Sequence, residues 1–436
     1  MRFPQRRLFV AALTSAVVAI SFGFPSPAAA AEPLPNAGPV LSRADSLERL
    51  KRENLALVAA RHRLTQARAD VVAAGLWTNP NISVNGLFAT HGAVTGGRQE
   101  VSVSIDQVIP IAGQVGLRKD FARGMLSAEE RAYAANVWDV VSDARVAYVD
   151  LQRAQARWRV LRAGITDLAR VESVVTTRAA AGANAAYDRI RVDVERSKLE
   201  GRLAQSEADL LGARATLAQA IGQSVDGRTV AVEEALDDAG EAPLSTDVDA
   251  LVKRALANRP DVGSARARAD AGDLRVSYLR RQVIPSPDLS IGYIRFIDAP
   301  GAFNGTNGGA MLAGVSFPIP LLDHGQGTID RGLALAAEDR ARKDGVELAA
   351  RREIERAVAT MAVRVATWRR FRDTTSLDID RLRTIGELSY REGRATILEL
   401  LDAYASYVDA QERRIELQAA AARAALDVER AVGPSS

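Results

Sequence analysis

The sequence predicts a mainly α-helical protein with a β-barrel portion, in which each chain supplies four strands and two pairs of long coiled-coil helices. Three observations predict this fold class. Aromatic residues make up 5% and charged residues 25% of the 436 residues, and long stretches lack proline, a mixture typical of extended helices. The N-terminal stretch has the pattern of an export signal. The remaining sequence consists of two similar repeats, and each repeat has, between helical runs, a pair of segments in which apolar residues alternate with polar or small ones.

The N-terminal stretch, residues 1–31, has the three parts of a signal peptide. Basic residues precede the apolar run LFVAALTSAVVAISFGF, and Ala29 and Ala31 give a small-residue cleavage site. A membrane anchor is the alternative, but the apolar run is short for a membrane span. We therefore expect an exported chain, which is periplasmic, secreted or an outer-membrane β-barrel.

Charge and cysteine content narrow the function classes. Without the three arginines of the signal, 54 basic residues balance 54 acidic ones, so charge gives no reason to expect nucleic acid as a partner. The chain has no cysteine, which excludes disulfides, thiolate metal sites and a lipid anchor on cysteine. After residue 31 no apolar run reaches the length of a transmembrane helix, so a membrane location would have to rest on strands.

Internal similarity indicates a duplication. Three phrases recur in the same order, with offsets of 207, 208 and 211 residues. The pairs are NPNISVNG and SPDLSIGY, VIPIAGQVG and FPIPLLDHGQG, and AGANAAYDRI and EGRATILELL. A nearly constant offset predicts repeat 1 over 32–221, an inter-repeat equatorial linker over 222–248, and repeat 2 over 249–436.

Each repeat is expected to begin with helices and continue with two strands. In repeat 2, Pro260 opens a second helix, as proline suits a first helical turn. The strand pairs lie near 80–109 and near 287–318, where apolar residues alternate with polar or small ones. The apolar residues that share one face are Val101, Val103 and Ile105 in the first pair, and Leu289, Ile291 and Tyr293 in the second.

A very long helix follows the strands in each repeat, over 115–178 and 328–390, and a second helix returns after a reversal near Gly182 or Gly393. The returning helix of repeat 2 carries a 4-3-4-3-4 stripe that predicts a coiled-coil seam: Ile397, Leu401, Tyr404, Val408, Gln411 and Ile415. The matching stripe of repeat 1 is poor in bulky residues and allows close approach of a neighbour: Ile190, Val194, Ser197, Gly201, Ala204, Ala208 and Leu211. The long helices are expected to begin at the Pro/Gly-Gln phrases, which act as junctions between strands and helices, and His324 lies in one of these junctions rather than in a site.

Four strands cannot close a membrane barrel, because open edges leave backbone groups unpaired in lipid and single-chain barrels need at least eight strands. Three chains would pool twelve strands, and a cyclic trimer would also bundle the long helices. The alternative is a periplasmic coiled-coil scaffold without a pore.

Family resemblance agrees with the composite barrel. The phrases IPIAGQVGLRKDFARG, FPIPLLDHGQGTIDRG and SYREGRATILELLDAYASYVDAQ resemble the TolC family of outer-membrane efflux channels, and the resemblance covers residues 42–432. The FPIPLLDHGQG form most resembles the CzcC/CusC-like branch, which serves RND-type heavy-metal efflux pumps. The resemblance implies a homotrimer with a 12-stranded barrel in the outer membrane, a helical periplasmic tunnel, and docking onto a periplasmic adaptor and an inner-membrane pump. A channel for drug efflux or type I secretion remains an alternative, because the substrate is not written in the sequence.

Candidate functional residues lie around the tunnel tip. Glu399 and Asp402 are spaced i,i+3, so both carboxylates share one helix face, where threefold symmetry would make acidic rings that favour cations. Spacing alone favours a solvated helix face, whereas the resemblance implies that both carboxylates line the periplasmic constriction. The family's gate resembles a latch of Asp, Tyr and Arg, and Asp188 and Tyr390 match two of these positions. The position of the arginine reads Ala395, next to Arg394.

Gly182 and Gly393 mark the tips that the resemblance implies for adaptor docking. His62, His91 and His324 lack metal-ligand spacing, so we expect no metal site and no cofactor. The sequence has no phosphate-binding glycine loop and no Ser-His-Asp order, and we do not expect an enzyme.

Overall fold

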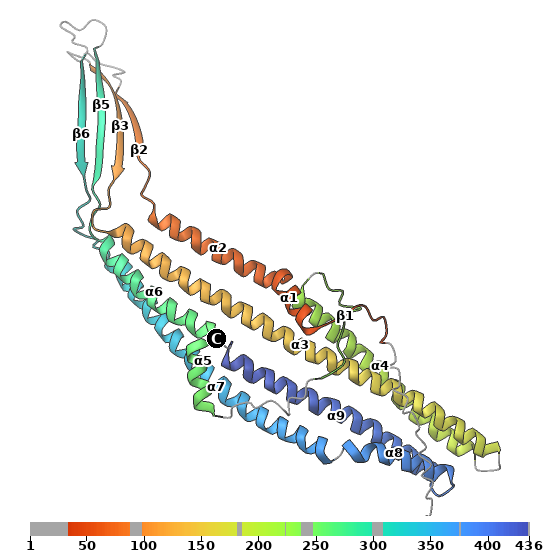
Figure 1. Ribbon diagram of the computed structural model, residues 1–436. Coiled ribbons are helices and arrows are strands. Elements are labelled where there is room, and N and C mark those ends of the chain that lie inside the picture. The colour runs from red at the N-terminus through yellow and green to blue at the C-terminus, as the bar shows by residue number, and fades with distance from the viewer. Residues whose placement is uncertain are drawn as a thin grey trace, which may run out of the picture.

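The computed structural model describes residues 34–87, 98–180, 185–222, 224–236, 247–298, 308–374 and 376–434. The protomer is elongated, with a sheet at one end and helical hairpins running away from it to a tip at the other end (Figure 1). The predicted signal peptide, His91 and Gly182 lie outside the described residues. Mainly helical structure with four long strands confirms the predicted fold class for the protomer.

The four predicted strands form one antiparallel sheet in the order β2-β3-β5-β6. Their bounds are Asn81–Leu87, Arg98–Val108, Asp288–Asp298 and Gly308–Ser316. The register aligns Ile105 with Ile291 and Val103 with Tyr293, so the alternating apolar residues of both repeats share one face. No helix covers that face in the described part of the chain, and the sheet projects beyond the helices in Figure 1.

The helical runs before the strands are each divided in two. In repeat 2, α5 (Val248–Asn258) is followed by α6 (Pro260–Gln282), which begins at the predicted proline. In repeat 1 a break occurs that the sequence interpretation missed, between α1 (Arg43–Glu53) and α2 (Leu55–Gly75). The Asn54 side chain accepts hydrogen bonds from the next turn, at 2.9 Å from Ala56 N, and so caps the second helix.

The long helices are α3 (Gln114–Ala180) and α4 (Ala185–Ile221) in repeat 1, and α7 (Gln326–Thr374), α8 (Ser376–Arg391) and α9 (Ile397–Val432) in repeat 2. The run predicted as one helix over 328–390 is helical on both sides of residue 375, as α7 and α8, and residue 375 lies outside the described residues. The helices α3 and α7 begin at equivalent junctions, one in each repeat. Gln114 Oε1 accepts from Ala112 N at 2.9 Å, and Gln326 Oε1 accepts from His324 N at 3.0 Å. The glycines before them, Gly113 and Gly325, have φ of +74° and +75°, a region that favours glycine.

The two hairpins pack side by side along α3 and α9. The predicted stripe of α9 is buried at Ile397, Leu401, Tyr404, Val408 and Ile415. Beside it runs a ladder of ion pairs between α3 and α9, with N···O distances of 2.6–2.8 Å. Its rungs are Arg145–Glu429, Arg153–Glu416, Arg157–Glu412, Arg423–Asp150 and Arg430–Asp143. Apolar stripe and ladder together join the two repeats.

The small-residue stripe of α4 differs from its counterpart in α9, because all seven of its residues are exposed in the protomer. Ile190 is 61% and Leu211 48% exposed. The face of α4 that packs inside the protomer instead carries Val192, Leu199, Leu210, Leu217 and Ile221. The stripe is therefore available to a neighbour outside the protomer.

Near the middle of the protomer a short parallel pair joins β1 (Val40–Leu41) to β4 (Ala231–Val232), the latter within the predicted linker. None of the helices in the described ranges has an apolar stretch of the length that crossing a membrane requires.

Candidate functional site

The described tip is the turn between α8 and α9. Gly393 has φ of +73°, which favours glycine because a Cβ would clash with the backbone there. After the reversal, Arg394 N and Ala395 N donate to Ser389 O at 2.8 and 3.1 Å. The last turn of α8 therefore has its carbonyls satisfied, and the chain enters α9 in a defined direction.

Glu399, the third residue of α9, caps the start of that helix with its side chain. Its Oε2 accepts from Thr396 N at 2.6 Å and from Thr396 Oγ1 at 3.0 Å, and Glu399 N donates to Thr396 Oγ1 at 3.3 Å. This reciprocal pair is a capping box. The hydrogen bonds from the Thr396 backbone and side chain lower the pKa of the exposed Glu399 carboxyl, so it remains negatively charged at neutral pH.

Asp402 is exposed on α9 and lines a groove of about 390 Å³ between α4 and α9. Arg191 and Lys198 of α4 line the same groove, as does Glu195. Asp402 makes no hydrogen bond or ion pair with the described residues. Of the two predicted tip carboxylates, Asp402 is therefore the one that is not engaged in a hydrogen bond within the described residues.

Asp188 and Tyr390, which are 202 residues apart, come together in the structure. Tyr390 Oη donates to Asp188 Oδ2 at 3.2 Å, and this bond links α8 to α4 across the tips of the two hairpins. Tyr390 is 2% exposed and packs in the tip core with Ile397 and Leu400. The structure does not bring Arg394 into this link, because its Nε lies 3.2 Å from Glu392 Oε2 and its side chain is 78% exposed. The role of these residues in a gate stays a prediction.

A polar cluster that sequence reasoning missed lies one to two turns inside the tip. Arg383 Nη1 of α8 donates to Asp167 Oδ2 of α3 at 2.8 Å, and the Arg383 guanidinium lies 4.7 Å from the ring centre of Tyr407. Tyr404 Oη donates to Glu387 Oε1. Burial raises the pKa of Tyr404, and its hydrogen bond to Glu387 raises it further. The cluster thus pins α8 to both α3 and α9.

No sequence signal links these partners, because Asp167 and Arg383 are 216 residues apart and each looks like an ordinary surface charge in its own helix. A weak signal existed for Tyr404 alone, because it belongs to the apolar stripe that predicts the seam of α9. Only the packing of three helices brings the five side chains together.

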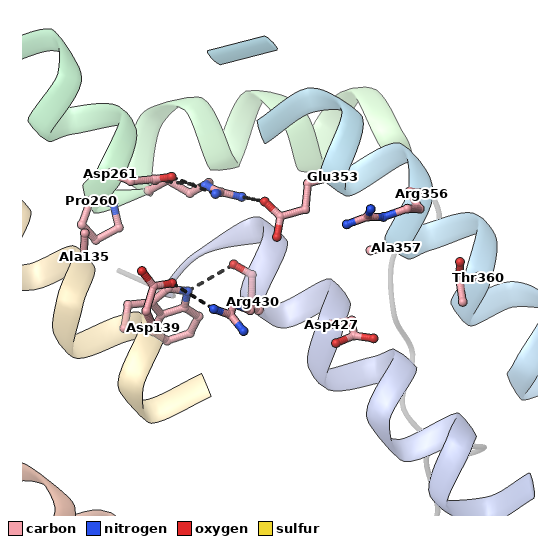
Figure 2. Close-up of a pocket in the computed structure, with 12 residues that line it drawn as sticks. Ala135, Asp139, Pro260, Asp261, Glu353, Arg356, Ala357, Thr360, Asp427 and Arg430 are labelled. Carbon is pink, nitrogen blue, oxygen red and sulfur yellow. Dashed lines mark hydrogen bonds and ion pairs between the residues drawn. The ribbon is translucent and has the colours of Figure 1, made fainter. Parts of the chain in front are cut away.

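A second polar cavity, of about 560 Å³, lies where the beginning of α6 meets the end of α9 beside α3 and α7 (Figure 2). Arg259 spans it, with nitrogens 2.8 Å from Asp261 Oδ2 and 2.7 Å from Glu353 Oε2. Burial lowers the pKa of Arg259, but the two carboxylates raise it by more, so the guanidinium stays charged. Across the cavity Arg430 reaches Asp139, and Trp138 Nε1 donates to the Arg430 carbonyl at 3.1 Å. Because the charged side chains around the cavity pair with one another, the cavity is a place where ion pairs hold the ends of α6 and α9 against α3 and α7.

Metal-binding groups do not cluster in the described residues, where no set of three or more His, Cys, Asp or Glu could hold an ion. His62 lies in α2, whereas His324 lies in the junction before α7.

Long helical hairpins that carry a four-stranded antiparallel sheet at one end define the class of TolC-like outer-membrane channel proteins. A crystal structure of CusC superposes with a TM-score of 0.74 at 17% identity, over 90% of this chain and 92% of that chain. The Campylobacter jejuni CmeC outer membrane channel superposes with a TM-score of 0.73 at 14% identity, over 98% and 94%.

The chain belongs to the outer membrane efflux protein family, whose sequence pattern matches residues 47–223 and 251–434. It is also 23% identical over 402 residues to the cobalt-zinc-cadmium resistance protein CzcC of Cupriavidus metallidurans, covering 91% of each chain. The predicted family is therefore confirmed, and the family is one of transport channels.

Proposed function

We propose that the chain is the outer-membrane component of a tripartite efflux system. Three copies form a 12-stranded barrel continued by a helical tunnel, and the tunnel docks onto a periplasmic adaptor and an inner-membrane pump of the RND type. Substrate that the pump delivers passes through the tunnel passively, and no step of the chain's own chemistry is required.

The observation that carries the proposal is the uncovered sheet. The exposed large side chains of its apolar face range from 37% at Ile297 to 76% at Met311, and both edge strands, β2 and β6, lack a second partner among the described residues. An exposed apolar face of this extent calls for an apolar environment, and open edges call for neighbouring strands. Lipid on the face and further copies at the edges satisfy both demands.

The helices support assembly as well. The exposed stripe of α4 has serine, glycine and alanine at its centre, from Ser197 to Ala208, so a helix of a neighbouring copy can approach it closely. A chain that pools strands at one end and helices along its length fits a closed ring better than an open array.

The tip supplies the proposed gate and docking surface. Glu399 and Asp402 face the constriction, and the Asp188–Tyr390 bond holds the tip closed, with Arg394 available to a neighbouring copy because its side chain is exposed. The adaptor docks at the tips marked by Gly182 and Gly393.

Heavy-metal cations are the proposed substrate. The support is the similarity to CzcC, which is named for cobalt, zinc and cadmium resistance, together with the carboxylates at the tip, which favour cations. A drug-efflux or type I secretion channel would share the architecture and differ in the pump.

Membrane fractionation and bilayer recordings test the channel. We expect the mature chain to resist carbonate extraction, to run as a trimer in mild detergent and to form conducting channels in planar bilayers. Ile291→Lys, on the apolar face, should lower the amount in the outer membrane, whereas Ser290→Lys, on the opposite face of the same strand, should not. A monomer that carbonate removes from membranes would instead indicate a periplasmic scaffold.

Export assays of a deletion strain test the substrate. Loss of the gene should sensitise cells to one or more of zinc, cobalt, cadmium and copper. Sensitivity to dyes alone, with normal metal tolerance, would assign the channel to drug efflux.

A further inference from the structure

The apolar face of the sheet carries one arginine, Arg295, near the end of the sheet that lies away from the helices. The register places Val101 and Gly309 on either side of it, in the row that follows Val103, Tyr293 and Met311. Arg295 is exposed, and it makes no hydrogen bond or ion pair with any described residue. The other polar side chains on this face of the described strands include Gln107, in the row of Leu289, and Gln99, in the row of Ile297 beyond Arg295. The guanidinium therefore stands at the far end of an apolar stretch, without a partner among the described residues.

The height of Arg295 on the sheet sets its depth in the membrane. The apolar face begins with the row of Leu289 and Val315, six residues along β5 from Arg295. At 3.4 Å per residue this is about 20 Å along the strand, or about 15 Å of height at the usual strand tilt, and the lipid-facing band of outer-membrane barrels is about 25 Å tall. In the membrane orientation of the proposed function, on which this inference rests, Arg295 lies in the outer part of that band, from which its long side chain reaches the outer headgroups.

A second donor stands next to this arginine. The ring of Tyr293 lies over Gly309, the direct cross-strand neighbour of Arg295, because any side chain at position 309 would collide with the Tyr293 hydroxyl. The glycine therefore lets the tyrosine lean toward the row of Arg295. Gly86 lies across Val101 in the same row and adds no side chain there. The surface offers a guanidinium fork and a phenol, both on exposed residues.

We propose that Arg295 and Tyr293 bind the phosphate group of an anionic lipid headgroup in the outer leaflet. A guanidinium fork matches the paired oxygens of a phosphate, and the phenol hydroxyl donates to a third oxygen. A tyrosine that leans toward the headgroups also fits the aromatic belt of membrane proteins. The pairing satisfies a cation that would otherwise stand unpaired in the outer part of the hydrocarbon.

Native mass spectrometry of the full chain in mild detergent tests the site with two lipids that differ only in phosphate, dioleoyl phosphatidic acid and dioleoylglycerol. We expect wild-type protein to bind phosphatidic acid about tenfold more tightly, and Arg295→Gln to abolish that preference. Tyr293→Phe should reduce the preference a few-fold. Arg364→Gln, which removes an exposed arginine of α7 that has no ion pair or hydrogen bond within the described part of the chain, should leave the preference unchanged.

Three results would overturn the inference: equal binding of both lipids, an undiminished preference in Arg295→Gln, or displacement of the lipid by 10 mM inorganic phosphate, which would indicate a general anion site. Bilayer recordings on the same samples separate this outcome from failure of the proposed function. Wild-type channels that conduct without a phosphate preference refute the lipid site alone, whereas wild-type protein that forms no channel refutes the proposed function and the inference with it.

Discussion

Tyr390→Phe is the sharpest test of the tip as a gate. The substitution removes the Oη that donates to Asp188 at 3.2 Å and keeps the ring, which is 2% exposed in the tip core. The helices should therefore keep their packing while the bond between α8 and α4 is lost. We expect the channel to spend more time open and to show a higher mean conductance in planar bilayers.

The magnitude follows from the geometry. A hydrogen bond to a charged acceptor contributes about 1.5–3 kcal/mol, and a long, half-exposed one about 1 kcal/mol. In a trimer that opens in one step, three lost bonds amount to about 3 kcal/mol, or roughly a hundredfold rise in the ratio of open to closed channels. The effect should show in single-channel recordings as a change in open probability.

Two further variants make the test decisive. Tyr187→Phe is the matched control, because Tyr187 lies next to Asp188, is 51% exposed and makes no hydrogen bond with the described residues. Asp188→Ala combined with Tyr390→Phe should open the channel no more than the stronger single variant, since both remove the same bond. An open probability in Tyr390→Phe equal to that of wild type, or fully additive effects, would remove this bond from the gate.

Three other predictions concern the neighbouring side chains. Because the fold lowers the pKa of Glu399, its cap is at full strength above the pKa of an unfolded glutamate, about 4.3, and weakens as the pH falls through the lower folded value. The protection of backbone amides at the start of α9 against hydrogen exchange should therefore decrease as the pH falls below about 4, and Glu399→Gln should flatten that decrease. Asp402→Asn should lower the cation-to-anion permeability ratio about twofold, measured as a reversal potential across a KCl gradient, and an unchanged potential would place Asp402 outside the ion path. Arg383→Gln, which leaves a largely buried Asp167 with weaker pairing, should cost about 2 kcal/mol in urea unfolding, whereas Arg381→Gln, whose side chain is 77% exposed, should cost much less.

Short sequence patterns were enough to predict most of the helices and strands. The alternation in both strand pairs predicted the shared apolar face, and the Pro/Gly-Gln junctions predicted where α3 and α7 begin, because proline and glycine act on the backbone at their own positions. The break at Asn54 was missed, since an asparagine inside a polar helical run looks like any other exposed residue until its side chain is seen to cap the next turn.

The sequence predicted only part of the arrangement of residues at the tip. Spacing predicted that Glu399 and Asp402 share one face of a helix, and both side chains are exposed in the protomer. The Thr396-x-x-Glu399 pattern also marks a capping box, and the structure shows that the Glu399 carboxylate serves the cap. The resemblance to the family's gate suggested Asp188 and Tyr390 as latch residues without showing that the two side chains touch.

The sequence by itself determined the order of helices and strands, their periodic faces and the duplication of the pattern, because each of these depends on residues close together in the chain. Only the tertiary structure decided which distant residues meet: Tyr390 with Asp188, Arg383 with Asp167, and the rungs between α3 and α9. These contacts depend on the rotation and offset of helices more than 200 residues apart, and a periodic pattern leaves both undetermined. The same holds for the sheet, where the register of β5 against β6 sets Tyr293 over Gly309 beside Arg295.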